Sequence, residues 1–406
     1  MSVPASERPD SGGLPRAASL MLNAGHAIDH MFLLIFATAV TSIAIDFGFS
    51  SWTDLMPYSV GAFALFGLGA LPAGRLGDLW GRRNMMIIFF AGMGASALLV
   101  ALTHNAWQLA AALTLLGAFA SIYHPVGIPM LVQSTTNPGA VIGINGLAGN
   151  LGIAIAALMT GLLVKWLGWR AAFVVPGIVA IACGIFFMLV CPRETEAPSR
   201  RTGGKAKVVL SPAMLVRTFA VMTATAVASS LLFNFTTNGN AQLLAEGFLG
   251  MIEDPATLGA MLAAIYAVAS LAQIVVGRMI DRMPFKPLQL WLSVVQIPFF
   301  ILAAHTQSWG LFLALLLVMV FVFGSIPFTD AMIVRYVDDR LRSRVAGMRL
   351  TVAFGISSIS VWLLGPMVKG MGFAAALWIM AGIAMIRAAI VLLLPDETSA
   401  TTHPGT

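Results

Sequence analysis

Long apolar runs separated by short polar stretches follow one another along the whole 406-residue chain. Most runs extend for about 20 residues or more, which is the length an α-helix needs to cross the hydrocarbon core of a bilayer. They are too continuous for the roughly ten-residue alternating strands of a membrane β-barrel. The pattern predicts an all-α membrane protein with twelve transmembrane helices. The predicted helices are residues 18–47, 53–73, 84–104, 107–134, 139–165, 169–191, 213–244, 256–280, 286–305, 308–336, 343–368 and 372–394.

A polar, basic segment interrupts this pattern near the middle of the chain. Residues 192–212 are rich in Pro, Ser and Gly, a composition typical of linkers. The segment divides the chain into an N-terminal bundle, residues 16–191, and a C-terminal bundle, residues 213–395, with six predicted helices each. We expect residues 1–15 to form a disordered cytoplasmic tail and residues 396–406 to form a second cytoplasmic tail.

Composition and charge agree with a membrane location. The chain is 59% apolar and only 10% charged, whereas a soluble domain has about 25% charged residues. Of the 23 Lys and Arg residues, nineteen fall in the segments on one side of the predicted topology and three on the other. Positive residues concentrate on the cytoplasmic side of membrane proteins, so both termini are predicted to lie on the cytoplasmic side of an inner (plasma) membrane. The net charge of +6 is then a topology signal, and we expect a monomer in the lipid bilayer with no nucleic-acid partner.

A charged turn between the second and third predicted helices has a second copy 203 positions downstream. The first copy is Gly-Arg-Leu-Gly-Asp-Leu-Trp-Gly-Arg-Arg, and the second repeats its Gly-Arg-x-x-Asp core. The repeat predicts two related halves. The candidate conformational-switch residues are Gly74, Asp78, Gly81, Arg82 and Arg83 in the first copy, and Gly277, Asp281 and Arg282 in the second.

The first predicted helix carries three ionisable residues, His26, Asp29 and His30, in an otherwise apolar span. At 100° per residue they lie within an arc of about 100°, on one face of the helix. A charge at the bilayer centre costs about 2.5–3.5 kcal/mol, so such residues usually line a polar cavity or form pairs. We predict that they exchange protons. The alternative is a structural pair that holds this helix to a neighbour.

Four further polar residues are candidates for contacting a substrate: His124, Asn150, Asp330 and Arg349. His124 lies about 14 Å from the cytoplasmic end of its predicted helix, and Asp29 lies about 15–17 Å from the end of its own. A shared site requires such matching depths, although a kink at Pro125 with an incidental histidine explains the pattern equally well. Arg349 can neutralise an anionic substrate, pair with Asp330 or extend to the membrane surface.

A run of polar residues, 234–240, lies near the end of the seventh predicted helix and contains three asparagines. Asn weakens helices, so the run either unwinds beside a cavity as a gate or frays at the outer end.

The charged turn resembles the loop between helices 2 and 3 of the major facilitator superfamily, a pattern close to Gly-x-Leu-x-Asp-Arg-x-Gly-Arg-Arg. Leu79 stands where that pattern has Arg. The resemblance implies two pseudo-symmetric six-helix bundles. It also implies that Asp78 engages the start of helix 11 and nearby arginines, stabilising the state closed on the cytoplasmic side, with Asp281 as a weaker counterpart.

A narrower resemblance involves the first and fourth helices. The sequences His-Ala-Ile-Asp-His at 26–30 and Tyr-His-Pro at 123–125 are similar to the His-x-x-Asn-Asp and Phe-His-Pro-Glu patterns of fosmidomycin-resistance-like exporters. This chain has Asp29, His30 and Val126 where that group has Asn, Asp and Glu. The resemblance implies an exporter.

These observations predict a secondary transporter that moves a small solute by alternating access, with proton antiport as the favoured mechanism. One alternative is a proton symporter that imports a small organic anion, and another is a transporter-shaped sensor or assembly factor. The chain has no Gly-x-x-x-x-Gly-Lys phosphate loop and no Gly-x-Ser-x-Gly elbow. It has no His/Cys cluster with metal-ligand spacing in the sequence. We therefore expect no enzyme activity, no cofactor and no metal.

Overall fold

The computed structural model describes residues 14–132, 138–193, 212–280, 282–328, 331 and 339–394. Within these ranges the regular structure is helical and contains no strand. Asp281, Asp330, most of the predicted linker and nearly all of both predicted tails lie outside the described residues.

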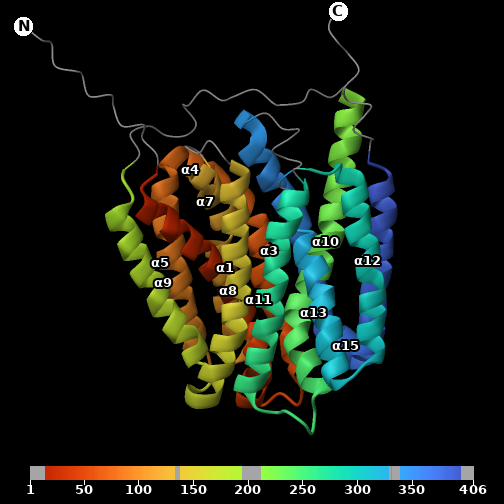
Figure 1. Ribbon diagram of the computed structural model, residues 1–406. Coiled ribbons are helices and arrows are strands. Elements are labelled where there is room, and N and C mark those ends of the chain that lie inside the picture. Colours follow the sequence, from red (N-terminus) through yellow and green to blue (C-terminus); the bar gives the residue numbers. More distant parts are fainter. Residues whose placement is uncertain are drawn as a thin grey trace, which may run out of the picture.

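The helices form two groups that stand beside one another (Figure 1). The first group is α1 (Arg16–Asp46), α2 (Trp52–Leu55), the 3-10 helix η1 (Met56–Ser59), α3 (Val60–Leu68), α4 (Ala70–Trp80), α5 (Arg82–Ala101), α6 (Ala106–Ala120), α7 (Tyr123–Val132), α8 (Pro138–Leu167) and α9 (Ala171–Val190). The second group is α10 (Pro212–Gly247), α11 (Pro255–Ile280), α12 (Phe285–His305), α13 (Ser308–Gly324) and α15 (Asp339–Leu392).

Nine helices in the described part of the chain are long and apolar enough to cross a membrane, or ten if one bent pair counts as a single span. The bent pair is Trp52–Leu68 with Ala70–Trp80, at 44°. The long helix α15 covers two predicted spans, because Gly372 interrupts it with a non-helical φ of 76°. A multi-span all-α protein is thus confirmed, and the count of twelve stays a prediction.

Two helix pairs make the most extensive contacts between the halves: α8 with α11, and α3 with α15. Glycines allow these backbones to approach closely. A Cβ on Gly161 of α8 would lie 2.5 Å from the carbonyl oxygen of Pro255, at the start of α11. A Cβ on Gly67 of α3 would lie 2.6 Å from the backbone nitrogen of Gly355. These positions have room for hydrogen only, so the halves are in backbone contact along both pairs.

The polar run on α10 is helical throughout, so both expectations for it, an unwound gate and a frayed end, are wrong. Asn234 Nδ2 donates to the carbonyl oxygen of Ser230 at 2.9 Å and to the hydroxyl of Ser357 on α15 at 3.0 Å. Asn238 Nδ2 donates to the carbonyl oxygen of Asn234 at 2.9 Å. Because these amides bond to their own helix and to a packed neighbour, they do not release the backbone.

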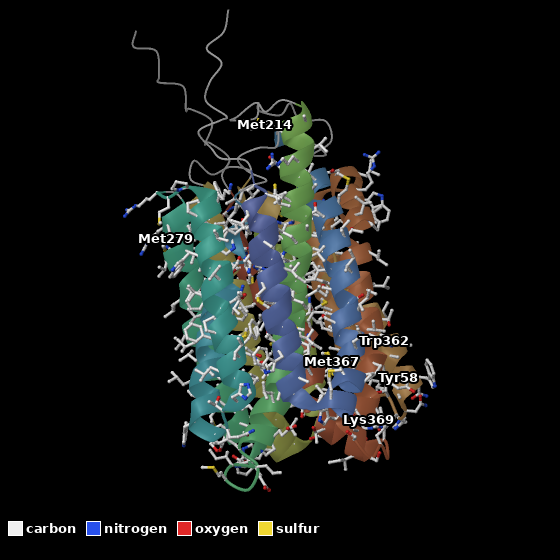
Figure 2. The ribbon with its side chains drawn as sticks, turned by 90° about the vertical axis from the view of Figure 1, so that its right-hand side faces the viewer. Tyr58, Met214, Met279, Trp362, Met367 and Lys369 are labelled. Atoms are coloured by element: carbon white, nitrogen blue, oxygen red, sulfur yellow. The ribbon has the colours of Figure 1, made fainter. Side chains whose placement is uncertain are left out.

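Opposite ends of the bundle are visible in a side view (Figure 2). Met214 and Met279 lie toward one end, and Tyr58, Met367 and Lys369 lie toward the other. The predicted topology groups these residues in the same way. Which end faces the cytoplasm stays a prediction.

Candidate functional site

Helices α1 and α7 bring four ionisable side chains together inside the N-terminal half. His26 and Asp29 are buried. His30 Nε2 lies 3.4 Å from His124 Nε2, and His124 Nε2 lies 3.6 Å from Asp29 Oδ2. The structure therefore joins the predicted proton-coupling face of the first helix to one predicted substrate residue, His124.

Tyr123 and Asn145 hold the ring of His26 in place. His26 Nδ1 lies 2.7 Å from the carbonyl oxygen of Asn145 on α8, and its ring stacks on Tyr123 with centroids 4.7 Å apart. Asn145 Nδ2 donates to the Tyr123 hydroxyl at 2.7 Å and to Asn23 Oδ1 at 2.9 Å. Asn145 is absent from the predicted site residues, although the sequence showed it as one of two asparagines in a glycine-rich helix.

Asp29 is the least compensated group in this cluster. Its carboxylate is fully buried, and within the described residues neither oxygen has a hydrogen bond. The nearest cationic candidate is His124, at 3.6 Å. Buried charges normally have both a partner and hydrogen bonds, so the state of this carboxylate depends strongly on what is bound beside it.

The cluster lies against the C-terminal half. The His30 ring is 6.5 Å from Phe233 of α10, and Phe66 contacts both His124 and Phe354 of α15, at centroid distances of 5.7 and 4.8 Å. Arg349, another predicted substrate residue, also lies on α15. Asn150 is buried on α8, and its Nδ2 has no hydrogen bond within the described part of the chain.

A second polar surface faces the interior from α10, and sequence reasoning did not assign it to the site. Its buried residues are Asn234, Thr236, Thr237, Asn238, Asn240 and Gln242. Gln242 links the halves: Thr41 Oγ1 of α1 donates to Gln242 Oε1 at 2.9 Å, and Gln242 Nε2 donates to the carbonyl oxygen of Ala37 at 3.1 Å. The sequence signal that could have identified these residues is the run of polar side chains on a long apolar helix.

The stretch predicted as a charged turn is mostly helical, which corrects that prediction: residues 74–80 end α4, residues 82–83 begin α5, and only Gly81 lies between the two helices. The stretch is attached to the end of α9. Gly81 has a φ of 92°, a conformation that glycine adopts without strain. Arg83 donates to the carbonyl oxygens of Cys191 at 2.8 Å and Met188 at 2.6 Å. Asp78 pairs with Arg82 at 3.9 Å within the turn.

Contact between α4 and α15 places this turn next to the C-terminal half. Gly74 packs against Pro125 of α7, where a Cβ would lie 3.2 Å from the ring. Gly277, in the second copy, has open space around its Cα, and Asp281 lies outside the described residues. The predicted switch roles of both copies, including Arg282, stay predictions.

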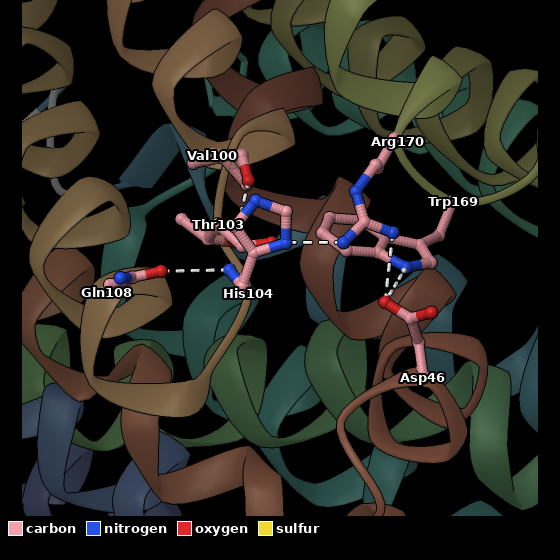
Figure 3. A network of polar contacts seen from close by, with 7 residues as sticks. All are labelled: Asp46, Val100, Thr103, His104, Gln108, Trp169 and Arg170. Atoms are coloured by element: carbon pink, nitrogen blue, oxygen red, sulfur yellow. Dashed lines mark hydrogen bonds and ion pairs between the residues drawn. The ribbon is translucent and has the colours of Figure 1, made fainter.

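At the opposite end, a polar network ties together the ends of α1, α5 and α9 (Figure 3). Asp46 accepts hydrogen bonds from Arg170 Nη1 at 2.9 Å and Trp169 Nε1 at 3.3 Å. Arg170 Nη2 donates to the carbonyl oxygen of Thr103 at 3.0 Å. His104 and Gln108 extend the network with a backbone-to-side-chain hydrogen bond of 2.9 Å.

Two ion pairs connect the halves at this same end. Lys165 Nζ of α8 lies 2.8 Å from Asp254 Oδ1, which precedes α11. Lys369 of α15 pairs with Asp54 of α2. The hydrogen bond from Lys165 holds the pKa of the Asp254 carboxyl below its usual value. Both pairs therefore cross between the two halves at this end.

The sequence profile described as Major Facilitator Superfamily matches residues 22–253, more than half of the chain. This chain belongs to the major facilitator superfamily. It is therefore a multi-pass membrane transporter rather than an enzyme, and transporters of this superfamily move small molecules across membranes. The resemblance carried by the charged turn is confirmed.

Solved structures agree with this fold. The chain superposes on the human organic anion transporter MFSD10 (TETRAN) with a TM-score of 0.70 at 15% identity, covering 95% of this chain and all of that one. It superposes on a bacterial homologue of the human lysosomal transporter Spinster, in an inward-facing and occupied conformation, with a TM-score of 0.72 at 15% identity. That match covers 95% of this chain and 98% of the homologue.

Among characterised relatives, the chain is similar to puromycin resistance protein pur8 of Streptomyces alboniger, with 29% identity over 180 residues. It is 30% identical over 205 residues to the multidrug efflux pump LfrA of Mycolicibacterium smegmatis. These matches cover 44% and 49% of this chain but only 34% and 39% of the relatives, little more than a third of their length.

A longer match is to an MFS-type efflux pump of Mycolicibacterium smegmatis, 27% identical over 340 residues, covering 80% of this chain and 73% of the pump. The narrower resemblance to fosmidomycin-resistance-like exporters stays a prediction.

Proposed function

We propose that this transporter exports a small organic solute in exchange for protons. The observation that carries the proposal is the carboxylate of Asp29, which is fully buried, lacks hydrogen bonds among the described residues and lies 3.6 Å from His124. An ionisable group inside a membrane usually marks an ion or substrate pathway. Relatives described as a puromycin resistance protein and a multidrug efflux pump favour export.

In this proposal Asp29 exchanges protons together with His26 or His30. The solute contacts His124, Asn150 and Arg349, and Asp330 contributes from the C-terminal half. The neutral amides of α10 supply fixed hydrogen bonds on the facing side. Asp29 and His124 are in contact, so a solute that approaches His124 changes the surroundings of the carboxylate and thereby links its own binding to proton release.

Alternating access requires the halves to separate at one end while they meet at the other. We propose that the charged turn with Asp78 and Arg82 acts at the cytoplasmic end, with both termini on that side of the plasma membrane. The ion pairs Lys165–Asp254 and Lys369–Asp54 then close the outer end, and they must break when the solute leaves. We propose that a monomer suffices, because both halves of the pathway belong to one chain.

The test uses purified protein in proteoliposomes, an imposed proton gradient and radiolabelled puromycin as the probe. We expect proton-driven transport by the native protein and a loss of at least about 100-fold in the Asp29→Asn variant, because the amide cannot exchange a proton. Asp46→Asn is the control, since Asp46 lies at the exposed end of the same helix. Unchanged transport by Asp29→Asn would rule out its proposed role.

A second candidate is proton-coupled import of a small organic anion, favoured by the cationic Arg349 on α15, the helix whose Phe354 packs against Phe66 beside His124. Uptake of organic anions stimulated by an inward proton gradient, and lost in Arg349→Gln, selects this alternative. Binding of a solute without any flux selects a sensor or assembly role.

A further inference from the structure

We propose that His26, His30 and His124 form a binding site for a divalent transition-metal cation of the zinc class. One ring nitrogen from each histidine lies within 4.8 Å of the other two. Neutral imidazole is the preferred ligand for such cations. The inference concerns metal binding alone, and it depends on neither export nor proton coupling.

The distance between two of the nitrogens already suits a metal. In a tetrahedral zinc site with Zn–N bonds of 2.0–2.1 Å, two nitrogen ligands are separated by about 3.3–3.4 Å. His30 Nε2 and His124 Nε2 are 3.4 Å apart. The third nitrogen lies within 4.8 Å of the other two and has to approach by at most about 1.4 Å, a movement within the range of a side-chain rotation.

His26 is oriented as a metal-binding histidine usually is. Its Nδ1 faces the carbonyl oxygen of Asn145 at 2.7 Å. A carbonyl only accepts hydrogen bonds, so Nδ1 carries the proton and the lone pair resides on Nε2. Metal-ligating histidines almost always donate their second nitrogen in this way. Gly149 leaves space for the ring, because a Cβ there would lie 2.7 Å from His26 Nε2.

Asp29 supplies the negative charge that a dication requires. Its Oδ2 is 3.6 Å from His124 Nε2, and both oxygens lack hydrogen bonds within the described part of the chain. With three neutral imidazoles, the carboxylate brings the net charge of the bound dication to +1. In a tetrahedral site the three histidines leave one position, which the carboxylate, a water or a solute can take. A proton shared between His30 and His124 would also give a 3.4 Å separation, so the experiment must separate the two occupants.

The experiment measures Zn²⁺ binding by isothermal titration calorimetry. The probe is the full chain in nanodiscs, purified with a tag that contains no histidine and then treated with a chelator. We expect one Zn²⁺ per chain. Replacement of Zn²⁺ by Co²⁺ should give the visible absorption of a four- or five-coordinate nitrogen site. Zn²⁺ should also raise the melting temperature, because it binds the native state.

Matched histidine variants locate the ion. We expect His30→Asn and His124→Asn each to weaken Zn²⁺ binding at least 100-fold, because each removes one of three ligands. The control variants His104→Ala and His305→Ala replace exposed histidines and should stay within twofold of the native affinity. Gel filtration and the melting temperature without metal verify folding. If His30→Asn fails to fold, His30→Gln takes its place. Absence of Zn²⁺ binding, or equal affinity in the ligand variants and the native chain, overturns the proposal.

Discussion

The helices that open the two halves, α1 and α10, both carry buried polar side chains, but of different kinds. The face of α1 is ionisable and includes Asp29, whose oxygens lack hydrogen bonds among the described residues. The face of α10 is neutral, and Asn234 and Gln242 bond to their own helix or to helices beside it. The difference indicates a division of labour: the N-terminal half can change its charge, whereas the C-terminal half offers fixed hydrogen bonds.

Exchanging the two kinds of group should have the largest effect. Asn238→Asp places a carboxylate on the neutral face, and we expect it to destabilise the protein by about 2.5–3.5 kcal/mol at neutral pH, the cost of a charge at this depth. Denaturant unfolding in detergent measures the change. Asn238→Leu is the control, because it removes the amide without adding charge, and it should cost less than Asn238→Asp. Equal losses would contradict the contrast between the two faces.

The reverse exchange, Asp29→Asn, should stabilise the protein while it removes proton coupling. Removing a poorly compensated buried charge is expected to gain about 1–2 kcal/mol at pH 8. The unfolding midpoint of the variant, compared with that of the native chain at the same pH, measures this gain. A large loss of stability would instead show that the Asp29–His124 pair is structural, which is the alternative that the sequence left open.

The connection between the two faces can be tested at Thr41. Thr41→Val removes the hydrogen bond to Gln242, and we expect a loss of about 0.6 kcal/mol, typical of such bonds between membrane helices. The control is Thr38→Val on the same helix, since among the described residues the Thr38 hydroxyl bonds to its own helix, at the carbonyl oxygen of Leu34. Hydrogen exchange near Gln242 should rise in the first variant and not in the second.

The smallest effect is expected at the exposed ion pair Lys165–Asp254. The lowered pKa of Asp254 means that the pairing stabilises the native state above the ordinary carboxyl pKa and is lost as the pH falls through the lowered value. Lys165→Gln should raise the pKa of Asp254 toward its ordinary value, measurable by NMR titration, and leave the melting temperature nearly unchanged. A large shift in melting temperature would show that this contact stabilises the whole bundle.

Much of the fold could be predicted from the sequence, because each membrane helix is marked by a local run of apolar residues. Apolar runs gave the span lengths and a gap between predicted helices 343–368 and 372–394, next to the break that the structure shows at Gly372. The charged stretch carried the resemblance to the superfamily. The polar run on α10 misled the prediction. Helix propensity favoured unwinding there, but packing against Ser357 and internal hydrogen bonds keep the helix intact.

Only part of the candidate site could be predicted from the sequence. Helical periodicity placed His26, Asp29 and His30 on one face. His124 was selected because its predicted depth in the membrane matches that of Asp29. Neither rule finds Asn145, because its contact with His26 depends on how α8 rotates against α1. Spacing along the chain also gave no metal cluster, since His124 is 94 positions from His30 and meets it only through packing.

By itself, the sequence determined that the chain is an all-α membrane protein, that it has two related halves and which face of α1 is ionisable. These properties follow from transfer free energy and the 3.6-residue helical period, both of which act locally. Only the tertiary structure decided that His124 meets His30 and Asp29, that Asn145 orients His26, and that Thr41 bonds to Gln242. Those contacts depend on the rotation and close approach of whole helices. Backbone contacts at residues such as Gly67 and Gly161 fix this arrangement, and no local sequence pattern encodes it.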